Sequence, residues 1–166
     1  VAEEYDVSRE AQDEYAARSH QRAAEATESG RFDDEIVPVE TEDGLVEADE
    51  GIRPDTTAEK LADLPPAFTG DGSVTAGNSS QISDGASLTV VTSKAFAEAH
   101  GLDVLAEVGT NNVAGVDPTV MGIGPVPATR GLLERAGTDI DDYDLVELNE
   151  AFASQCEYSR RELGID

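Results

Sequence analysis

The sequence predicts an α/β protein, and three observations support this fold class. Short apolar segments rich in β-prone residues, such as 87–92 and 143–148, alternate with segments whose apolar residues recur at helical spacing. Glycine and proline separate most of these segments. From residue 87 onward the order is strand, helix, strand, glycine-proline loop, helix, strand, helix, which is typical of α/β proteins.

The helical segments carry recognisable start and stop signals. The first begins at Ser8, whose hydroxyl can accept a backbone hydrogen bond of the first turn, and it ends before Gly30. Its apolar residues are Tyr15 and several alanines, which predicts close packing. Either Thr56 or Thr57 can cap a second, short helix. The predicted helices cover 8–29, a short helix between the Thr56 or Thr57 cap and Pro65-Pro66, 93–101, 127–137 and 150–164.

Four segments are predicted to be strands because they are short, apolar and rich in β-branched residues. Pro38 lacks a backbone donor and therefore limits the first of them to the edge of a sheet. A hairpin is expected around Asp43-Gly44. The predicted strands cover 35–40, 87–92, 103–108 and 143–148.

The net charge excludes several classes of partner. Eleven basic and 36 acidic residues give 11 − 36 = −25. Nucleic acids and anionic membranes require a basic surface, so neither is an expected partner. The acids are spread along a chain that is 39% hydrophobic, which favours a folded protein with an acidic surface, as in salt-adapted organisms.

The cysteine content and the apolar runs indicate a cytoplasmic setting. Cys156 is the only cysteine, so no internal disulfide can form, and its helical spacing from Phe152 predicts burial rather than reactivity. No apolar run reaches the length of a membrane span, and the first residues do not resemble a signal peptide. Because the chain does not begin with methionine, we expect it to be part of a longer polypeptide.

Common metal and nucleotide motifs are not matched. The acidic residues lack the order of a calcium-binding loop, and no metal site is expected. Pro127 stands where a dinucleotide-binding Gly-x-Gly-x-x-Gly pattern needs its third glycine. His20 lies among polar neighbours and is interpreted as a surface residue.

Asn149 is the strongest candidate for a functional residue. It lies between the predicted strand 143–148 and the helix that follows, where open α/β sheets place ligand-binding groups. The carboxamide can simply cap the helix, or it can direct a hydrogen bond to a ligand. Composition and spacing leave both interpretations open.

Asn149-Glu150-Ala151-Phe152 resembles the Asn-Glu-Ala-Phe signature of the thiolases, the acetyl-CoA acyltransferase family. Three further stretches resemble the same family in the expected order, including Leu64 to Phe68 (Leu-Pro-Pro-Ala-Phe) within the first of them. Four such motifs in register make the resemblance specific, and it extends over essentially the whole chain. The four stretches are 53–68, 73–85, 115–130 and 144–153.

The resemblance implies a layered α/β/α fold and acyl transfer between coenzyme A (CoA) thioesters, by thiolytic cleavage of a 3-ketoacyl-CoA or by condensation. It further implies that Asn149 holds a water in the oxyanion hole and that Met121 and Phe152 line the acyl pocket. Ser80 is implied to hydrogen-bond the pantetheine arm, with Phe68 beside that arm. Arg53 and Leu64 would lie near the nucleotide end.

By the same resemblance, residues 1–82 belong to the loop domain that covers CoA. Residues 83–103 would end the N-terminal half and 104–166 would begin the C-terminal half. CoA or acyl-CoA is expected as substrate, with no bound cofactor, and the complete protein is expected to be a homodimer or homotetramer.

The catalytic groups of the family are not matched within this sequence. The nucleophilic cysteine is expected upstream, and the Gly-His-Pro histidine and second cysteine downstream, so we expect the chain alone to be inactive. Cys156, His20 and His100 match none of them. The alternatives are a non-catalytic thiolase-like protein that binds acyl-CoA or a partner subunit, and an unrelated acidic interaction domain.

Overall fold

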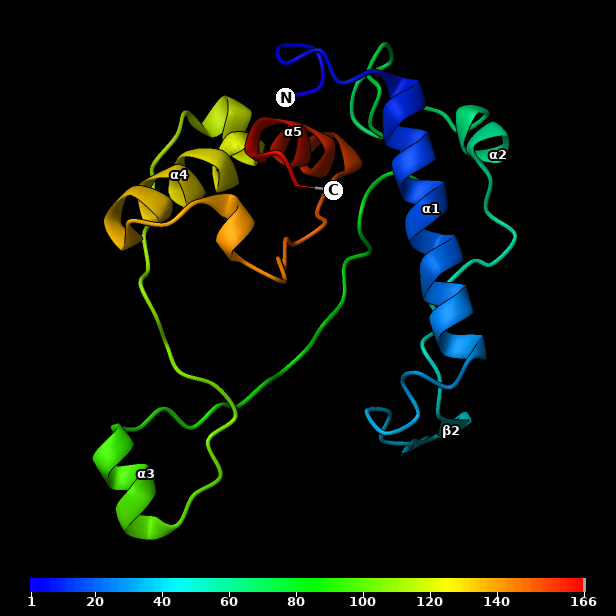
Figure 1. Ribbon diagram of the computed structural model, residues 1–166. Helices are drawn as coiled ribbons and strands as arrows, with labels where there is room; N and C mark the ends of the chain where they lie inside the picture. Colours follow the sequence, from blue (N-terminus) through cyan, green and yellow to red (C-terminus); the bar gives the residue numbers. More distant parts are fainter. Residues whose placement is uncertain (166) are drawn as a thin grey trace.

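A computed structural model describes residues 1–165 and shows a mixed helical and β protein (Figure 1). Helix α1 is the longest element, and the hairpin β1–β2 lies near its C-terminal end. Helices α4 and α5 lie together, whereas α3 lies apart at the end of two extended segments. The helices are α1 (Arg9–Glu28), α2 (Ala58–Ala62), α3 (Lys94–His100), α4 (Pro125–Ala136) and α5 (Ala153–Leu163); the strands are β1 (Val39–Thr41) and β2 (Gly44–Val46); and two 3₁₀ turns are η1 (Pro118–Ile123) and η2 (Ile140–Asp142).

The helix signals in the sequence operate as predicted. Ser8, Thr57 and Ser93 each cap a helix by accepting a backbone hydrogen bond in its first turn. The glycines that end α3, α4 and α5 all have positive φ, which is the left-handed conformation of a helix C-cap. Thr57 is therefore the cap of α2. Helix α4 begins two residues before the prediction, at Pro125.

Two small apolar clusters hold the helices together. Ala16 and Ala17 of α1 pack on Leu61 of α2, so the alanines provide the close approach that the sequence predicted. The second cluster joins Val126 of α4 to Tyr158 of α5, and it includes Val7 from the segment before α1. Val126 is only 1% exposed and is the most buried apolar residue of this cluster.

The buried face of α1 differs from the predicted apolar stripe. Besides the two alanines it buries Gln12 and Asp13, which are 0% and 2% exposed. Apolar periodicity does not reveal these residues because both are polar. Their burial requires partners, since an unpaired polar group in the interior costs free energy.

The β structure is smaller than predicted. The hairpin around Asp43-Gly44 is confirmed, with Val39 paired to Val46, but its first strand starts at Val39 and not at residue 35. Pro38 precedes this strand, as its missing donor requires.

The predictions of strands at 87–92, 103–108 and 143–148 are wrong for the part of the chain that the structure describes. These segments run without regular secondary structure, and Leu88, Leu105 and Leu145 are 94%, 99% and 89% exposed. A β-strand exists only through hydrogen bonds to a neighbour, and within residues 1–165 no segment pairs with these three. Their β-prone composition is therefore not sufficient to form a sheet.

Candidate functional site

The loop that carries Ser80 is hydrogen-bonded to the segment between Asn149 and α5. The Ser80 backbone N–H donates to the Ala151 carbonyl at 3.0 Å, and the Ala153 N–H donates to the Asn78 carbonyl at 3.0 Å. Ser79 and Phe152 form an isolated antiparallel bridge between the same segments. Residues about 70 positions apart in the sequence are thereby joined at one edge of the molecule.

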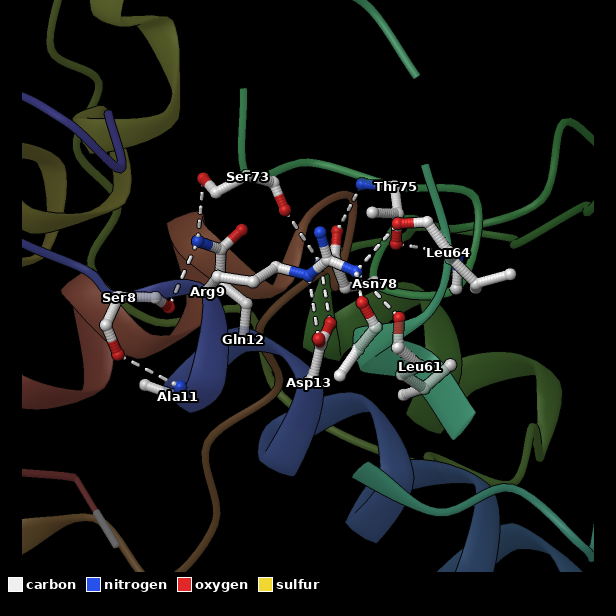
Figure 2. Close-up of polar contacts among 12 residues, drawn as sticks. Ser8, Arg9, Ala11, Gln12, Asp13, Leu61, Leu64, Ser73, Thr75 and Asn78 are labelled. Atoms are coloured by element: carbon white, nitrogen blue, oxygen red, sulfur yellow. Dashed lines mark hydrogen bonds and ion pairs between the residues drawn. The ribbon is translucent and has the colours of Figure 1, made fainter. Parts of the chain in front are cut away.

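A buried polar network anchors the 73–80 loop of this junction to α1 and α2 (Figure 2). Asp13 accepts a hydrogen bond from Arg9 Nε at 2.7 Å and another from Asn78 Nδ2 at 2.9 Å. The Arg9 guanidinium also donates to the Leu61 and Leu64 carbonyls, at 2.6 and 3.0 Å, near the C-terminal end of α2. The network therefore connects α1, α2 and the loop at 73–80.

Three of the predicted site residues line one open cavity. Arg53, Ser80 and Asn149 all border a hollow of about 890 Å³, together with residues of α1 and of the 76–81 loop. Ligand-binding clefts in proteins are typically about 300–1,000 Å³, so the hollow is large enough for a substantial small molecule. The chain thus brings together three residues that lie in three separate stretches of sequence.

The other predicted site residues lie outside this lining. Phe68 and Phe152 contact each other edge to face, with ring centroids 6.3 Å apart, and Phe152 is next to the 79–80 loop. Leu64 packs beside Leu61 on the α1–α2 cluster. Met121 lies in η1 and is 67% exposed, and it does not border the cavity.

Asn149 does not cap helix α5, which excludes the simpler interpretation of this residue. The helix begins at Ala153 and its N-cap is Phe152, so the predicted start at Glu150 is wrong. Among the residues that the structure describes, no hydrogen-bond partner contacts the Asn149 carboxamide, which is exposed at the cavity. The side chain is therefore free to contact a ligand.

Tyr15 of α1 and Cys156 of α5 both lie close to Glu150 and to each other. The Tyr15 hydroxyl donates to Glu150 Oε1 at 2.5 Å, and burial together with this hydrogen bond raises the pKa of Tyr15. Burial also raises the pKa of Cys156 to about 11, although a hydrogen bond with Tyr15 lowers it, and the neighbouring carboxylates Glu150 and Glu157 act in the same direction as burial. Cys156 is 1% exposed, so the prediction of a buried, unreactive thiol agrees with its position.

His20 was missed as a neighbour of the site. Its side chain borders the cavity and its Nδ1 accepts a hydrogen bond from the Arg53 backbone N–H at 3.2 Å. Burial and the Arg53 charge lower the pKa of His20. Nothing in the sequence indicated the contact, because 33 residues separate the two.

Within residues 1–165 no group of three or more His, Cys, Asp or Glu side chains is arranged to hold a metal ion. Among the helices of that part of the chain, none combines the length and the apolar character needed to cross a membrane.

The fold and the cavity define this chain as a mixed helical and β protein with one large open cavity that three predicted site residues border, and comparison with known proteins identifies its family. Residues 1–95 match the family model "Thiolase, N-terminal domain", and residues 102–166 match "Thiolase, C-terminal domain". The chain belongs to the thiolase family. The likeness stated from the four motifs is thereby confirmed.

Individual relatives are similar over nearly the whole chain. A 3-ketoacyl-CoA thiolase of Marinobacter nauticus is 53% identical over 93% of this chain and 41% of its own length. An acetyl-CoA acetyltransferase of Pseudomonas aeruginosa is 50% identical over 100% of this chain and 44% of its own length. The chain therefore spans less than half the length of these curated relatives.

Solved structures show the same fold. The acetyl-CoA acetyltransferase of Bacillus anthracis has a TM-score of 0.90 at 50% identity, and 99% of this chain covers 43% of that one. Human mitochondrial 3-ketoacyl-CoA thiolase in complex with CoA has a TM-score of 0.91 at 45% identity. The match covers 99% of this chain and 42% of the human chain. The predicted partial thiolase-like α/β fold is confirmed, although the three strand segments named above are unpaired.

Proposed function

We propose that this chain supplies the CoA-holding part of an enzyme that transfers acyl groups between CoA thioesters. One observation carries the proposal: Arg53, Ser80 and Asn149 border a single cavity although they come from three separate stretches. The relatives named as 3-ketoacyl-CoA thiolases and acetyl-CoA acetyltransferases, and the human relative solved with CoA, support this substrate class.

Each residue of the proposed site has a role that suits its chemistry. The Asn149 carboxamide would hold a water against the thioester oxygen, where a lost oxyanion donor typically costs about 2.7–4 kcal/mol. The Ser80 hydroxyl would hydrogen-bond the pantetheine arm, and the Phe68 ring would lie beside that arm. Arg53 and Leu64 would contact the nucleotide end, where a guanidinium suits a phosphate. Met121 and Phe152 would line the acyl pocket.

The chain on its own is proposed to bind CoA without catalysing turnover. Thiolase chemistry needs a nucleophilic thiol, and the only cysteine is buried with a pKa raised to about 11. This observation also favours the second candidate function, a non-catalytic thiolase-like subunit that binds acyl-CoA or a partner. Thiol-dependent cleavage of acetoacetyl-CoA by purified residues 1–166 would contradict the inactivity and remove the second candidate.

The oligomeric state of the complete protein is proposed from a relative, and its location and salt adaptation are proposed from its composition. A homo-oligomer is favoured because one similar structure is the dimeric peroxisomal thiolase of Saccharomyces cerevisiae, which is 42% identical with a TM-score of 0.87. A cytoplasmic location and an acidic surface adapted to high salt remain proposals that follow from the charge of −25 and the single cysteine.

Titration calorimetry with acetyl-CoA tests the proposed site. Ser80→Ala and Arg53→Ala are expected to weaken binding by about 3–10-fold and 10–100-fold, because a neutral hydrogen bond contributes about 1 kcal/mol and a charge-assisted one about 1.5–3 kcal/mol. Ser87→Ala and Arg31→Ala are matched controls, since neither residue borders the cavity. Unchanged affinity in the first two variants, or no binding by the unsubstituted chain, would overturn the proposal.

A further inference from the structure

The buried pair Asp13–Asn78 lies beneath the proposed CoA site without having a ligand-binding role of its own. Asp13 is 2% exposed and Asn78 is 3% exposed. The two side chains are 65 residues apart in the sequence and are joined by a hydrogen bond of 2.9 Å. We propose that this pair is a positioning device that fixes Ser80 relative to Asn149, an inference that rests on the proposed function.

Asp13 has little freedom to change its geometry. One carboxylate oxygen accepts from Arg9 Nε and the other from Asn78 Nδ2. A buried carboxylate without partners is strongly unfavourable, so both hydrogen bonds are retained as a unit. Arg9 is itself anchored by the Leu61 and Leu64 carbonyls, which extends this fixed geometry to α2.

Asn78 transmits that geometry to the loop through its remaining polar groups. Its Oδ1 accepts from the Thr75 backbone N–H at 2.8 Å, and its Nδ2 also donates to the Ser73 carbonyl at 3.1 Å (Figure 2). The carboxamide is thus engaged at both ends within the protein. It is therefore assigned to positioning, although the residue borders the cavity.

The backbone of the same residue reaches the other side of the site. The Asn78 carbonyl accepts from Ala153 N–H, and two residues later Ser80 N–H donates to the Ala151 carbonyl. Ser80 therefore takes part in one of these hydrogen bonds itself, and Asn149 lies two positions before its acceptor, Ala151.

Two variants separate positioning from general destabilisation. Asn78→Ser keeps a short acceptor for Thr75 N–H but loses donation to Asp13. The exchange Asp13→Asn with Asn78→Asp restores a donor and an acceptor across the pair and leaves Arg9 an acceptor, but the Ser73 carbonyl loses its donor, so the expected rescue is partial. Asn111→Ser is the control, since Asn111 is exposed. A partial rescue by the exchange is a result that two independent destabilisations would not give.

The first measurement is amide hydrogen exchange by NMR and needs no ligand. In Asn78→Ser the Ser80 and Ala153 amides are expected to exchange about tenfold faster or more, while the amides of α4 stay unchanged. The double variant, Asp13→Asn with Asn78→Asp, should restore much of the protection. Ser80 and Ala153 amides that exchange as in the unsubstituted chain would overturn the inference, even where the chain binds no CoA and the proposed function itself fails.

The second measurement compares two ligands. Acetyl-CoA would reach Ser80 and Asn149, whereas adenosine 3′,5′-diphosphate carries only the nucleotide end. Asn78→Ser is expected to weaken acetyl-CoA about tenfold and to change the affinity for adenosine 3′,5′-diphosphate less than about twofold. An equal loss for both ligands would show a structural role alone and would overturn the positioning role.

Discussion

The Tyr15 hydroxyl donates a hydrogen bond to the Glu150 carboxylate at 2.5 Å, which links α1 to the residue that follows Asn149. The contact spans 135 residues of sequence. It joins α1 to the C-terminal part of the chain at the cavity wall, where both residues lie. Its removal tests how α1 supports the site.

We expect Tyr15→Phe to lower the free energy of unfolding by about 0.5–1.5 kcal/mol, the usual net value of one hydrogen bond. Urea denaturation at pH 8 measures this. Tyr143→Phe is the control, because the Tyr143 hydroxyl contacts Thr138 away from the cavity. An unchanged free energy of unfolding in Tyr15→Phe would contradict the prediction.

The same residue predicts a pH dependence. The pKa of Tyr15 is raised in the folded chain, so the phenol stays protonated there while the unfolded phenol ionises near pH 10. A group with a raised pKa stabilises the fold below its unfolded pKa, and that contribution declines as the pH rises further. The unsubstituted chain should therefore lose stability more steeply than Tyr15→Phe between pH 9 and about 11. Parallel pH profiles would contradict this.

Cys156 is expected to resist alkylation. Burial raises its pKa to about 11, so at pH 8 only about one thiol in a thousand is ionised. The residue is also only 1% exposed, which limits access of a reagent to the sulfur. Iodoacetamide should react at least about 100-fold more slowly than with free cysteine at pH 8, and the rate should rise with pH. The urea-unfolded chain is the control, and a fast reaction of the folded chain would contradict the prediction.

Gly77 is expected to tolerate no side chain. A Cβ at this position would lie 2.4 Å from Leu61 Cδ2 and 2.6 Å from Leu64 Cδ1. Because Leu61 is packed in the α1–α2 cluster, Gly77→Ala should lower stability by about 1–3 kcal/mol through overpacking. Gly70→Ala is the control, since nothing lies within 4 Å of its Cβ, and it should change stability by less than about 0.5 kcal/mol. Thermal unfolding compares the two.

The acidic surface predicts a requirement for salt. With a net charge of −25 the folded chain repels itself, and salt shortens the range of this repulsion from about 30 Å at 0.01 M to about 3 Å at 1 M. We expect the circular dichroism of the helices to decrease when salt falls from molar to millimolar. A spectrum that is identical in both conditions would contradict salt adaptation.

The capped starts of α1, α2 and α3 were predictable because their signals are local. Ser8, Thr57 and Ser93 each bond to a backbone amide three residues away, and this contact needs no distant partner. The strand predictions had no such basis. The segment 87–92 has the composition of a strand, but strand formation depends on a neighbour that composition does not specify.

The site was predictable only through its motifs. Asn149 was indicated by its predicted position between a strand and a helix and, like Ser80, by the likeness to thiolases, and both border the cavity together with Arg53. The roles assigned to these residues stay predictions until ligand binding is measured. Asp13, Asn78 and the His20–Arg53 contact were not anticipated, because a buried polar residue has the same sequence signature as an exposed one.

The amino-acid sequence by itself determined the family, the capped N-termini of α1, α2 and α3 and the acidic charge, since each depends on residue identity or on contacts within a few residues. Only the tertiary structure decided that Asn149 does not cap α5 and that Asp13 meets Asn78. It also decided which β-prone segments remain unpaired. The physical reason is that burial and strand pairing join residues far apart in the chain, and their free energy depends on partners that no local pattern identifies.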